Sequence, residues 1–198
     1  MRPQISAAVE GSTDEAVVRN LIHHVGAVPG KVYIQRGKGN LRQRINGFSH
    51  AARTSPWLIL VDLDQDAPCA PPLCRDWVPH PAPHLCFRVA VRALEAWLMA
   101  DTDALASYLS VAKTRVPADP EAEADPKRSM VNLARRSRRR ALVQDMVPRE
   151  GSGRSEGPAY ASRIVEFAGH HWRPDVAAER SDSLRRAIAC LRRLAGAR

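Results

Sequence analysis

The chain has little of what membrane proteins, disulfide-rich proteins and base-stacking proteins require. In 198 residues there are only four cysteines, 5% of the residues are aromatic, and no apolar run approaches the roughly 20 residues needed to cross a bilayer. So few cysteines argue against a disulfide framework, and no basic stretch is interleaved with aromatic residues for stacking on bases. Residues 1–4 lead directly into a strand pattern and resemble no signal peptide. We therefore expect a cytoplasmic protein that does not associate with membranes.

Lysine is also scarce, although the chain is strongly basic. Lysine and arginine together number 30 against 21 acidic residues, which gives a formal net charge of +9, and only four of the 30 are lysine. Arginine makes bidentate contacts with phosphate, so the basic excess late in the chain predicts sequence-nonspecific binding of nucleic acid. A solvent-exposed helix face explains the same pattern equally well. The candidate nucleic-acid contacts in this region are Arg135, Arg136, Arg138, Arg139 and Arg140.

Strand and helix patterns alternate in the first half of the chain. Apolar stretches with strand character end at glycine, proline or acidic residues, and most are followed by a helical pattern. Ser12 and Glu15 have the spacing of a capping box at the start of the first helix. Alternating strands and helices indicate a mainly parallel sheet covered by helices. The predicted strands are residues 4–9, 31–35, 57 to about 66 and 85–91, and the predicted helices are 12–25, 41–52 and 92–101.

Strand patterns are absent from about residue 101 onward. An acidic, proline-rich linker, a basic helix, a glycine- and serine-rich loop and two further helices are predicted at residues 117–126, 127–143, 149–158, 160–168 and 181–194. We therefore predict an α/β fold in one domain, a three-layer sandwich with a mainly parallel central sheet of about four strands. Residues 1–101 form its α/β core, and residues 102–198 form a mostly helical C-terminal extension packed on it.

Three acids follow an apolar run at alternate positions. Residues 57–61 read Trp-Leu-Ile-Leu-Val, and the acids are Asp62, Asp64 and Asp66. Because side chains alternate along a strand, Asp62 and Asp64 are predicted to point the same way, and Asp66 joins them if the strand continues. Crowded carboxylates repel one another unless a cation lies between them, and their hard oxygens suit Mg²⁺ or Mn²⁺. A solvated acidic turn is the competing interpretation.

Further candidates lie where the other strands meet their helices. Glu10 follows the first strand, and open α/β sheets build their sites at the carboxyl ends of strands. Glu95 falls in the first turn of the helix after the fourth strand, near the same edge, although the helix dipole alone also favours an acid there. Arg36 and Lys38 flank a glycine in a turn that opens a helix, an arrangement that can hold phosphate.

Cysteine and histidine gather in one proline-rich segment that is predicted to be a loop. The residues are Cys69, Cys74, His80, His84 and Cys86, with Cys-x4-Cys and His-x3-His spacings. These are zinc ligands by type. The gap between the cysteines and the histidines is too short for a zinc finger, however, so structural or incidental use of these residues is favoured over zinc.

Several of these stretches resemble a known fold. The acid–glycine turn at residues 9–15 and the Asp62-Leu63-Asp64 strand end resemble the Toprim fold of primases, type IA and II topoisomerases and nucleases of the overcoming-lysogenization-defect type. Residues 94–101, 125–128 and 181–187 resemble DUF4276, an uncharacterised Toprim-like family. The resemblance implies that Glu10 is a general acid/base or metal ligand, that Asp62 and Asp64 hold Mg²⁺ or Mn²⁺, and that Glu95 belongs to a Glu-Ala-Trp signature.

The resemblance also implies a function. It suggests a metal-dependent phosphodiesterase or nuclease in a mobile-element or phage-defence setting, working with a separate ATPase because this chain has no nucleotide-binding loop. A non-catalytic module that binds nucleic acid or a partner ATPase is the alternative. A haloacid-dehalogenase-like phosphatase fits less well, because its Asp-x-Asp motif belongs on the first strand. The choices between DNA and RNA, and between endonuclease and exonuclease, stay open.

Overall fold

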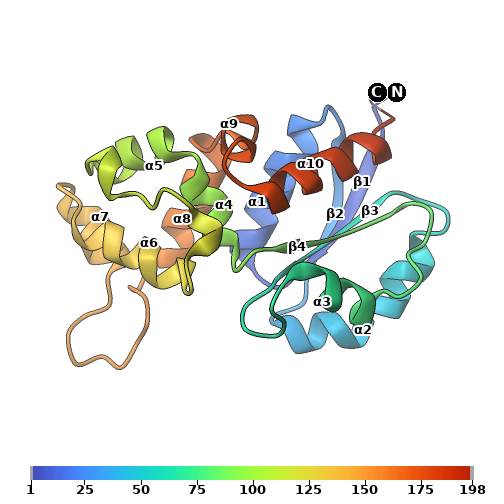
Figure 1. Cartoon of the computed structure of the whole chain (residues 1–198), viewed down its shortest axis with the longest axis horizontal. Coiled ribbons are helices and arrows are strands. Elements are labelled where there is room, and N and C mark those ends of the chain that lie inside the picture. Colours follow the sequence, from blue (N-terminus) through green and yellow to red (C-terminus); the bar gives the residue numbers. More distant parts are fainter. Residues whose placement is uncertain (1, 197–198) are drawn as a thin grey trace.

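Four parallel strands form the centre of the structure, a computed structural model that describes residues 2–196. The strands are β1 (Gln4–Val9), β2 (Val28–Ile34), β3 (Trp57–Asp62) and β4 (Leu85–Ala90). They lie side by side in the order β2-β1-β3-β4 (Figure 1). The chain therefore moves outward from β1 in one direction to β2 and in the other direction to β3 and β4. Open α/β sheets bind ligands at such a reversal, outside the carboxyl ends of the strands.

Helices cover both faces of this sheet, as the three-layer prediction requires. The helix α1 (Ser12–His24) packs on one face, and α2 (Lys38–Ala51) and α3 (Ala70–Trp77) pack on the other (Figure 1). Right-handed crossovers give this division, because the connection from β1 to β2 runs opposite to the later ones. Along β3, Leu58 and Leu60 face α1, whereas Ile59 and Val61 face α2 and α3. Burial on both faces explains why the strand reads as a continuous apolar run.

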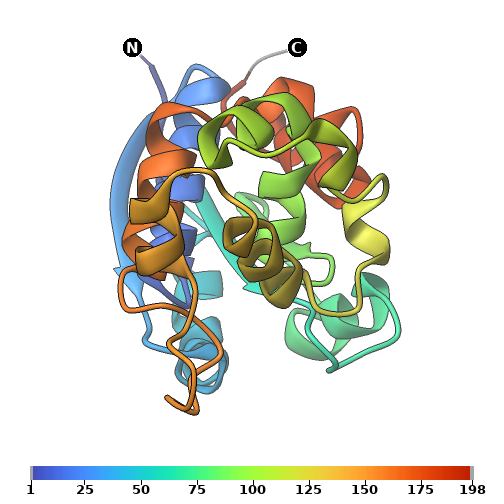
Figure 2. The ribbon, with the colours of Figure 1, turned by 90° about the vertical axis from the view of Figure 1, so that its left-hand side faces the viewer.

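The second half of the chain is helical and packs on the α1 face. The last helix contacts β4, and α8 contacts α1 (Figures 1 and 2). One apolar cluster runs from β1 through α1 and into these helices, so the extension shares the core of the sheet on this face. No helix within residues 2–196 is long and apolar enough to cross a membrane. The helices are α4 (Leu94–Ala100), α5 (Thr102–Leu109), α6 (Pro126–Arg135), α7 (Arg140–Met146), α8 (Tyr160–His170), α9 (Pro174–Ala178) and α10 (Asp182–Leu194).

Several predicted boundaries in the second half are wrong. The basic helix predicted at 127–143 is two helices, α6 and α7, with residues 136–139 between them. The predicted acidic linker contains a 3-10 turn (Pro120–Ala122) whose Pro120 is buried, so this segment packs against the protein. The short helices α3 and α9 were not predicted, because each is only one or two turns long and begins with prolines that read as loop residues.

The first helix begins differently from the prediction. Its N-cap is Gly11, and the Gly11 N–H donates to Asp14 Oδ2 at 2.7 Å. Glu15, which was predicted to close the capping box, instead pairs with Arg19 one turn later at 2.8 Å. Asp14 therefore lies at the carboxyl edge of the sheet, bonded to the turn that follows β1.

Two of the cysteines that were considered as zinc ligands, Cys74 and Cys86, lie on opposite faces of the sheet. Residues 70–77 of the predicted loop are helix α3, and Cys74 packs into the apolar cluster beneath it. Cys86 is a buried residue of β4 that belongs to the opposite face, where its thiol meets Cys190 of α10. Because the sheet separates Cys74 from Cys86, the five residues do not converge on one ion.

Candidate functional site

A cleft of about 540 Å³ lies at the carboxyl ends of β1 and β3, where the strand order reverses. Its walls come from the turn between β1 and α1, the end of β3, the start of α4 and the first residues of α6. Two of the residues that line it are basic, Arg92 and Lys127. Six lining residues are acids, namely Glu10, Asp14, Asp62, Asp64, Glu95 and Asp125. The cleft thus brings together four of the predicted site residues, Glu10, Asp62, Asp64 and Glu95, and adds Asp14 and Asp125.

Glu10 and Asp62 meet across the ends of two neighbouring strands. The N–H of Asp62 donates to Glu10 Oε1 at 3.2 Å, and the N–H of Leu94 donates to Asp62 Oδ1 at 2.9 Å. Backbone donors therefore orient both carboxylates, and each bond uses one oxygen of its carboxylate. The second oxygen of each remains a potential ligand for a cation in the cleft.

The cleft is lined by more acidic residues than basic ones. Burial raises the pKa of Glu10 from 4.5 to about 7. Burial, together with the negative charges of Asp14, Glu95 and Glu10, raises the pKa of Asp62 well above its usual range. Burial also raises the pKa values of Asp14 and Glu95 because removal from water disfavours the charged form. A cation among these groups would stabilise their charged forms.

Glu95 is contacted by a residue from the helical half of the chain. Glu95 is buried, with 8% of its surface exposed, and the Tyr160 hydroxyl donates to Glu95 Oε1 at 2.9 Å. The Lys127 ammonium lies 5.4 Å from the centre of the Tyr160 ring and also pairs with Glu156. The predicted position of Glu95 at this edge is confirmed. Tyr160 and Lys127 were missed, because locally they read as the first residues of two ordinary helices.

Asp64 and Asp66 lie beyond the end of β3, and both pair with Lys38. The strand ends at Asp62, and Asp64 takes a left-handed backbone conformation with φ of 50°. The prediction that Asp62 and Asp64 project side by side from a continuing strand is therefore wrong. The Lys38 ammonium donates to Asp64 Oδ2 at 2.8 Å and pairs with Asp66 Oδ2 at 2.7 Å. Burial alone would lower the pKa of Lys38, but the bonds to these two carboxylates outweigh it and raise the pKa.

The predicted nucleic-acid contacts have two different environments. Lys38 is engaged by Asp64 and Asp66, whereas Arg36 is exposed in the turn before α2. The five arginines at 135–140 are all exposed at the corner between α6 and α7, and no ion pair involves them within the described residues. Because Arg135 at the end of α6 follows Lys127 by eight residues, about 12 Å of helix separates this corner from Lys127 in the cleft.

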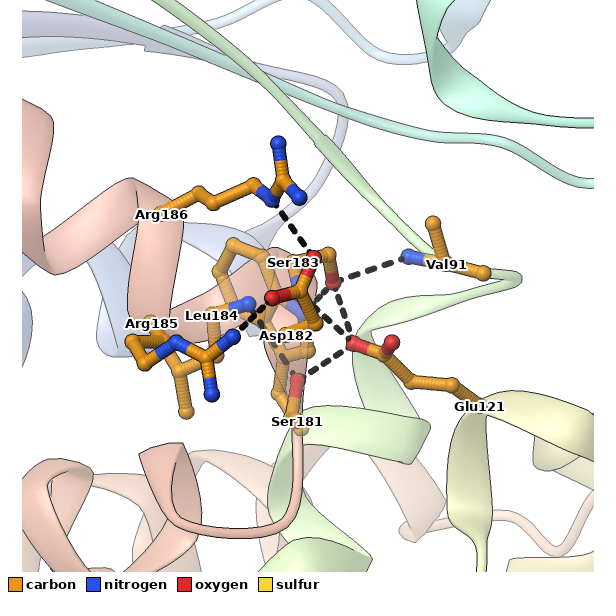
Figure 3. A network of polar contacts seen from close by, with 9 residues as sticks. Val91, Glu121, Ser181, Asp182, Ser183, Leu184, Arg185 and Arg186 are labelled. Atoms are coloured by element: carbon orange, nitrogen blue, oxygen red, sulfur yellow. Dashed lines mark hydrogen bonds and ion pairs between the residues drawn. The ribbon is translucent and has the colours of Figure 1, made fainter.

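A polar network fixes the helical wall of the cleft (Figure 3). Glu121 Oε1 accepts bonds from the Ser181 hydroxyl at 2.5 Å, the Ser183 hydroxyl at 2.6 Å and the Ser183 N–H at 3.0 Å. The Ser183 hydroxyl oxygen in turn accepts from Trp97 Nε1 at 2.6 Å and from the N–H of Val91 at 3.4 Å. The segment that leads into residues 124–127 is thereby tied to α10, α4 and the end of β4.

The donor set of the cleft suits a hard divalent cation. Within residues 2–196, no three histidine, cysteine or acidic side chains form a ready-made metal site. Mg²⁺ does not require one, because it keeps several of its waters and binds through one or two carboxylates together with substrate oxygens. Glu10 and Asp62 provide two oriented carboxylates at one point, with Asp14 and Glu95 in the same cleft. The residues present therefore fit Mg²⁺ or Mn²⁺.

Comparison with known proteins gives no match of any kind. No family model matches the chain, and neither the curated proteins nor the solved structures contain a significant match. The resemblance to Toprim proteins and to DUF4276 therefore stays a prediction from the motifs. The chemistry of the cleft is the observation on which a function can be proposed.

Proposed function

We propose that this chain is a divalent-cation-dependent phosphodiesterase or nuclease that acts on nucleic acid. The proposal rests on four carboxylates, Glu10, Asp14, Asp62 and Glu95, whose pKa values are raised by burial. They lie in one cleft at the point where the strand order of the parallel sheet reverses. Hydrolysis of a phosphodiester needs charge neutralisation on the phosphoryl group and an activated water. Bound Mg²⁺ or Mn²⁺ supplies both.

In this proposal the residues of the cleft have different roles. Glu10 and Asp62 hold the cation, since backbone N–H groups already orient both carboxylates toward the cleft. Glu95 orients the attacking water, because the Tyr160 hydroxyl fixes one of its oxygens and leaves the other for a hydrogen bond. Such preorganised groups need no rearrangement when substrate binds.

The charge of the chain supports a polyanionic substrate. The formal net charge is +9, and the exposed arginines at 135–140, together with Arg36, are not neutralised by acids within the described residues. Contacts of this kind hold the phosphate backbone without reading its sequence, so binding should weaken steeply with salt. The motif resemblance to Toprim proteins and DUF4276 points the same way, and adds a mobile-element or phage-defence setting with a separate ATPase subunit.

Cleavage of defined nucleic acids tests the proposal. Single- and double-stranded DNA and RNA are incubated with the protein and Mg²⁺ or Mn²⁺, with EDTA in parallel. We expect cleavage that requires the cation and is lost in Glu10→Ala and Asp62→Ala. The matched control is Asp103→Asn, which removes an exposed acid that pairs with Lys113 outside the cleft. Cleavage that persists unchanged in both alanine variants would exclude the cleft as the active site.

One observation favours a second candidate function, a non-catalytic module that binds nucleic acid or a partner ATPase. In the part of the chain that the structure describes, no three ligands are prearranged around one point. A binding module would retain nucleic-acid or ATPase binding in the Glu10 and Asp62 variants and would cut none of the four substrates. The same cleavage panel, combined with filter binding at two salt concentrations, therefore separates the two functions.

A further inference from the structure

A second cation position at this sheet edge is already filled by the chain itself. Three oxygens surround the Lys38 ammonium: Asp64 Oδ2 at 2.8 Å, Asp66 Oδ2 at 2.7 Å and the Leu63 carbonyl oxygen at 3.5 Å. The Lys38 side chain is only 18% exposed, whereas Asp64 and Asp66 are 52% and 46% exposed. Two carboxylates and a carbonyl oxygen are ligands typical of a hard cation, and here an ammonium occupies their centre.

The backbone holds both sides of this position. On the Lys38 side, Gly37 has φ of 117°, which favours glycine, and its N–H donates to the Glu10 carbonyl oxygen at 3.2 Å. On the other side, the Asp64 N–H donates to the Arg92 carbonyl oxygen at 2.7 Å, and Arg92 Nη1 donates back to the Asp64 carbonyl oxygen at 3.1 Å. Both partners are therefore placed by contacts other than their own ion pair.

We propose that Lys38 permanently occupies the cation position formed by Asp64 and Asp66 beside the cleft, so that this sheet edge takes one divalent ion instead of two. Enzymes that use two metal ions place them about 3.5–4 Å apart between shared carboxylates. An ammonium is a compact point charge with three donors, and it supplies positive charge next to the ion held by Glu10 and Asp62. The location of that first ion rests on the proposed function, but the occupancy of the Asp64–Asp66 position does not.

The number of Mn²⁺ ions bound per chain tests this proposal without any assay of activity. Mn²⁺ binding is measured by electron paramagnetic resonance and calorimetry for the wild type, Lys38→Met, Asp66→Asn and the Lys38→Met/Asp66→Asn double variant. We expect one ion in the wild type, two in Lys38→Met, and one in each protein that carries Asp66→Asn. Methionine keeps the length and apolar stem of lysine while removing its charge. Circular dichroism verifies that each variant is folded.

The outcomes separate this proposal from the proposed function. Two ions in the wild type, or no additional ion in Lys38→Met, would overturn the role of Lys38. No ion in the wild type but one in Lys38→Met, lost again in the double variant, would uphold Lys38 and reject the metal site at Glu10 and Asp62. If Lys38→Met does not fold, Asp66→Asn still decides, since loss of the wild-type ion in that variant would make Asp66 a ligand and contradict the proposal.

Discussion

Two sets of acids at one sheet edge have opposite electrostatic environments. The inner set, represented by Glu10 and Asp62, receives hydrogen bonds from backbone N–H groups but forms no ion pair within the described residues, and its pKa values are raised. The outer set, Asp64 and Asp66, lies two and four residues beyond Asp62 and shares Lys38. The difference shows that backbone direction after the strand, and not spacing of acids in the sequence, decides which carboxylates are available to an external cation.

The largest expected difference between the two sets is in hydrolysis. Asp62→Asn should reduce cation-dependent cleavage by about 1000-fold, because it removes a ligand of an ion worth several kcal/mol to the transition state. Asp66→Asn should change the rate by only a few-fold, since Asp66 lies outside the cleft and pairs with Lys38. The measurement is the initial rate of cleavage of one substrate at saturating Mg²⁺.

The two substitutions are chemically identical, so a general effect of losing an acid would appear in both. Asparagine can still accept the Leu94 N–H bond at position 62, which keeps the fold of the site. Equal losses of rate in Asp62→Asn and Asp66→Asn would contradict the division into an inner and an outer set.

The hydrogen bond between Tyr160 and Glu95 provides the next test. Tyr160→Phe removes the hydroxyl that donates to buried Glu95, and leaving a buried acceptor without its partner costs roughly 1–3 kcal/mol. We expect urea unfolding to report a loss of this size. The matched control is Tyr108→Phe, whose hydroxyl bonds to the more exposed Glu166, a carboxylate that retains Arg163. A loss in Tyr108→Phe as large as that in Tyr160→Phe would argue against a special role for the Glu95 contact.

The inner set is the part of the site that sequence patterns predict well. β1 and β3 are recognisable as short apolar runs followed by acids, and the carboxyl ends of parallel strands meet at one edge. Glu10 and Asp62 are adjacent for this reason. Glu95 follows the same logic, because α4 begins soon after β4 ends.

The remaining features depend on contacts between distant segments, which local patterns do not encode. Asp64 leaves the strand direction, and its N–H bonds to the Arg92 carbonyl oxygen beyond β4. In the sequence Asp14 has the position of a helix-capping residue, and it does accept a bond from the Gly11 N–H. That pattern does not indicate that Asp14 also lines the cleft. Lys127 reaches the cleft because α6 packs on α4. The break between α6 and α7 likewise interrupts a run of arginines that resembles one basic helix.

The raised pKa of Glu10 predicts a pH effect that the outer set should not share. The protonated carboxyl favours the folded state, so its contribution to stability is complete below about pH 4.5 and is lost as the pH rises through about 7. Glu10→Gln should therefore raise the melting temperature, relative to the wild type, at pH 8 but not at pH 4.5 when no divalent cation is present. Mg²⁺ should reduce the difference at pH 8. Asp66→Asn is the control, and an equal pH-dependent gain in it would refute the assignment to the inner cleft.

The smallest expected effect is the contribution of Lys38 to stability. Its two carboxylate partners are about half exposed, and ion pairs in such positions contribute about 0–1 kcal/mol each. Lys38→Met should therefore change the free energy of unfolding by less than about 2 kcal/mol, with a salt dependence, because solvent ions screen exposed charges. Lys113→Met removes a single, more exposed pair with Asp103 and should have a smaller effect. A large decrease in the free energy of unfolding of Lys38→Met that does not depend on salt would contradict this prediction. It would mean that Lys38 is required for the stability of the sheet edge, and that its main role is structural.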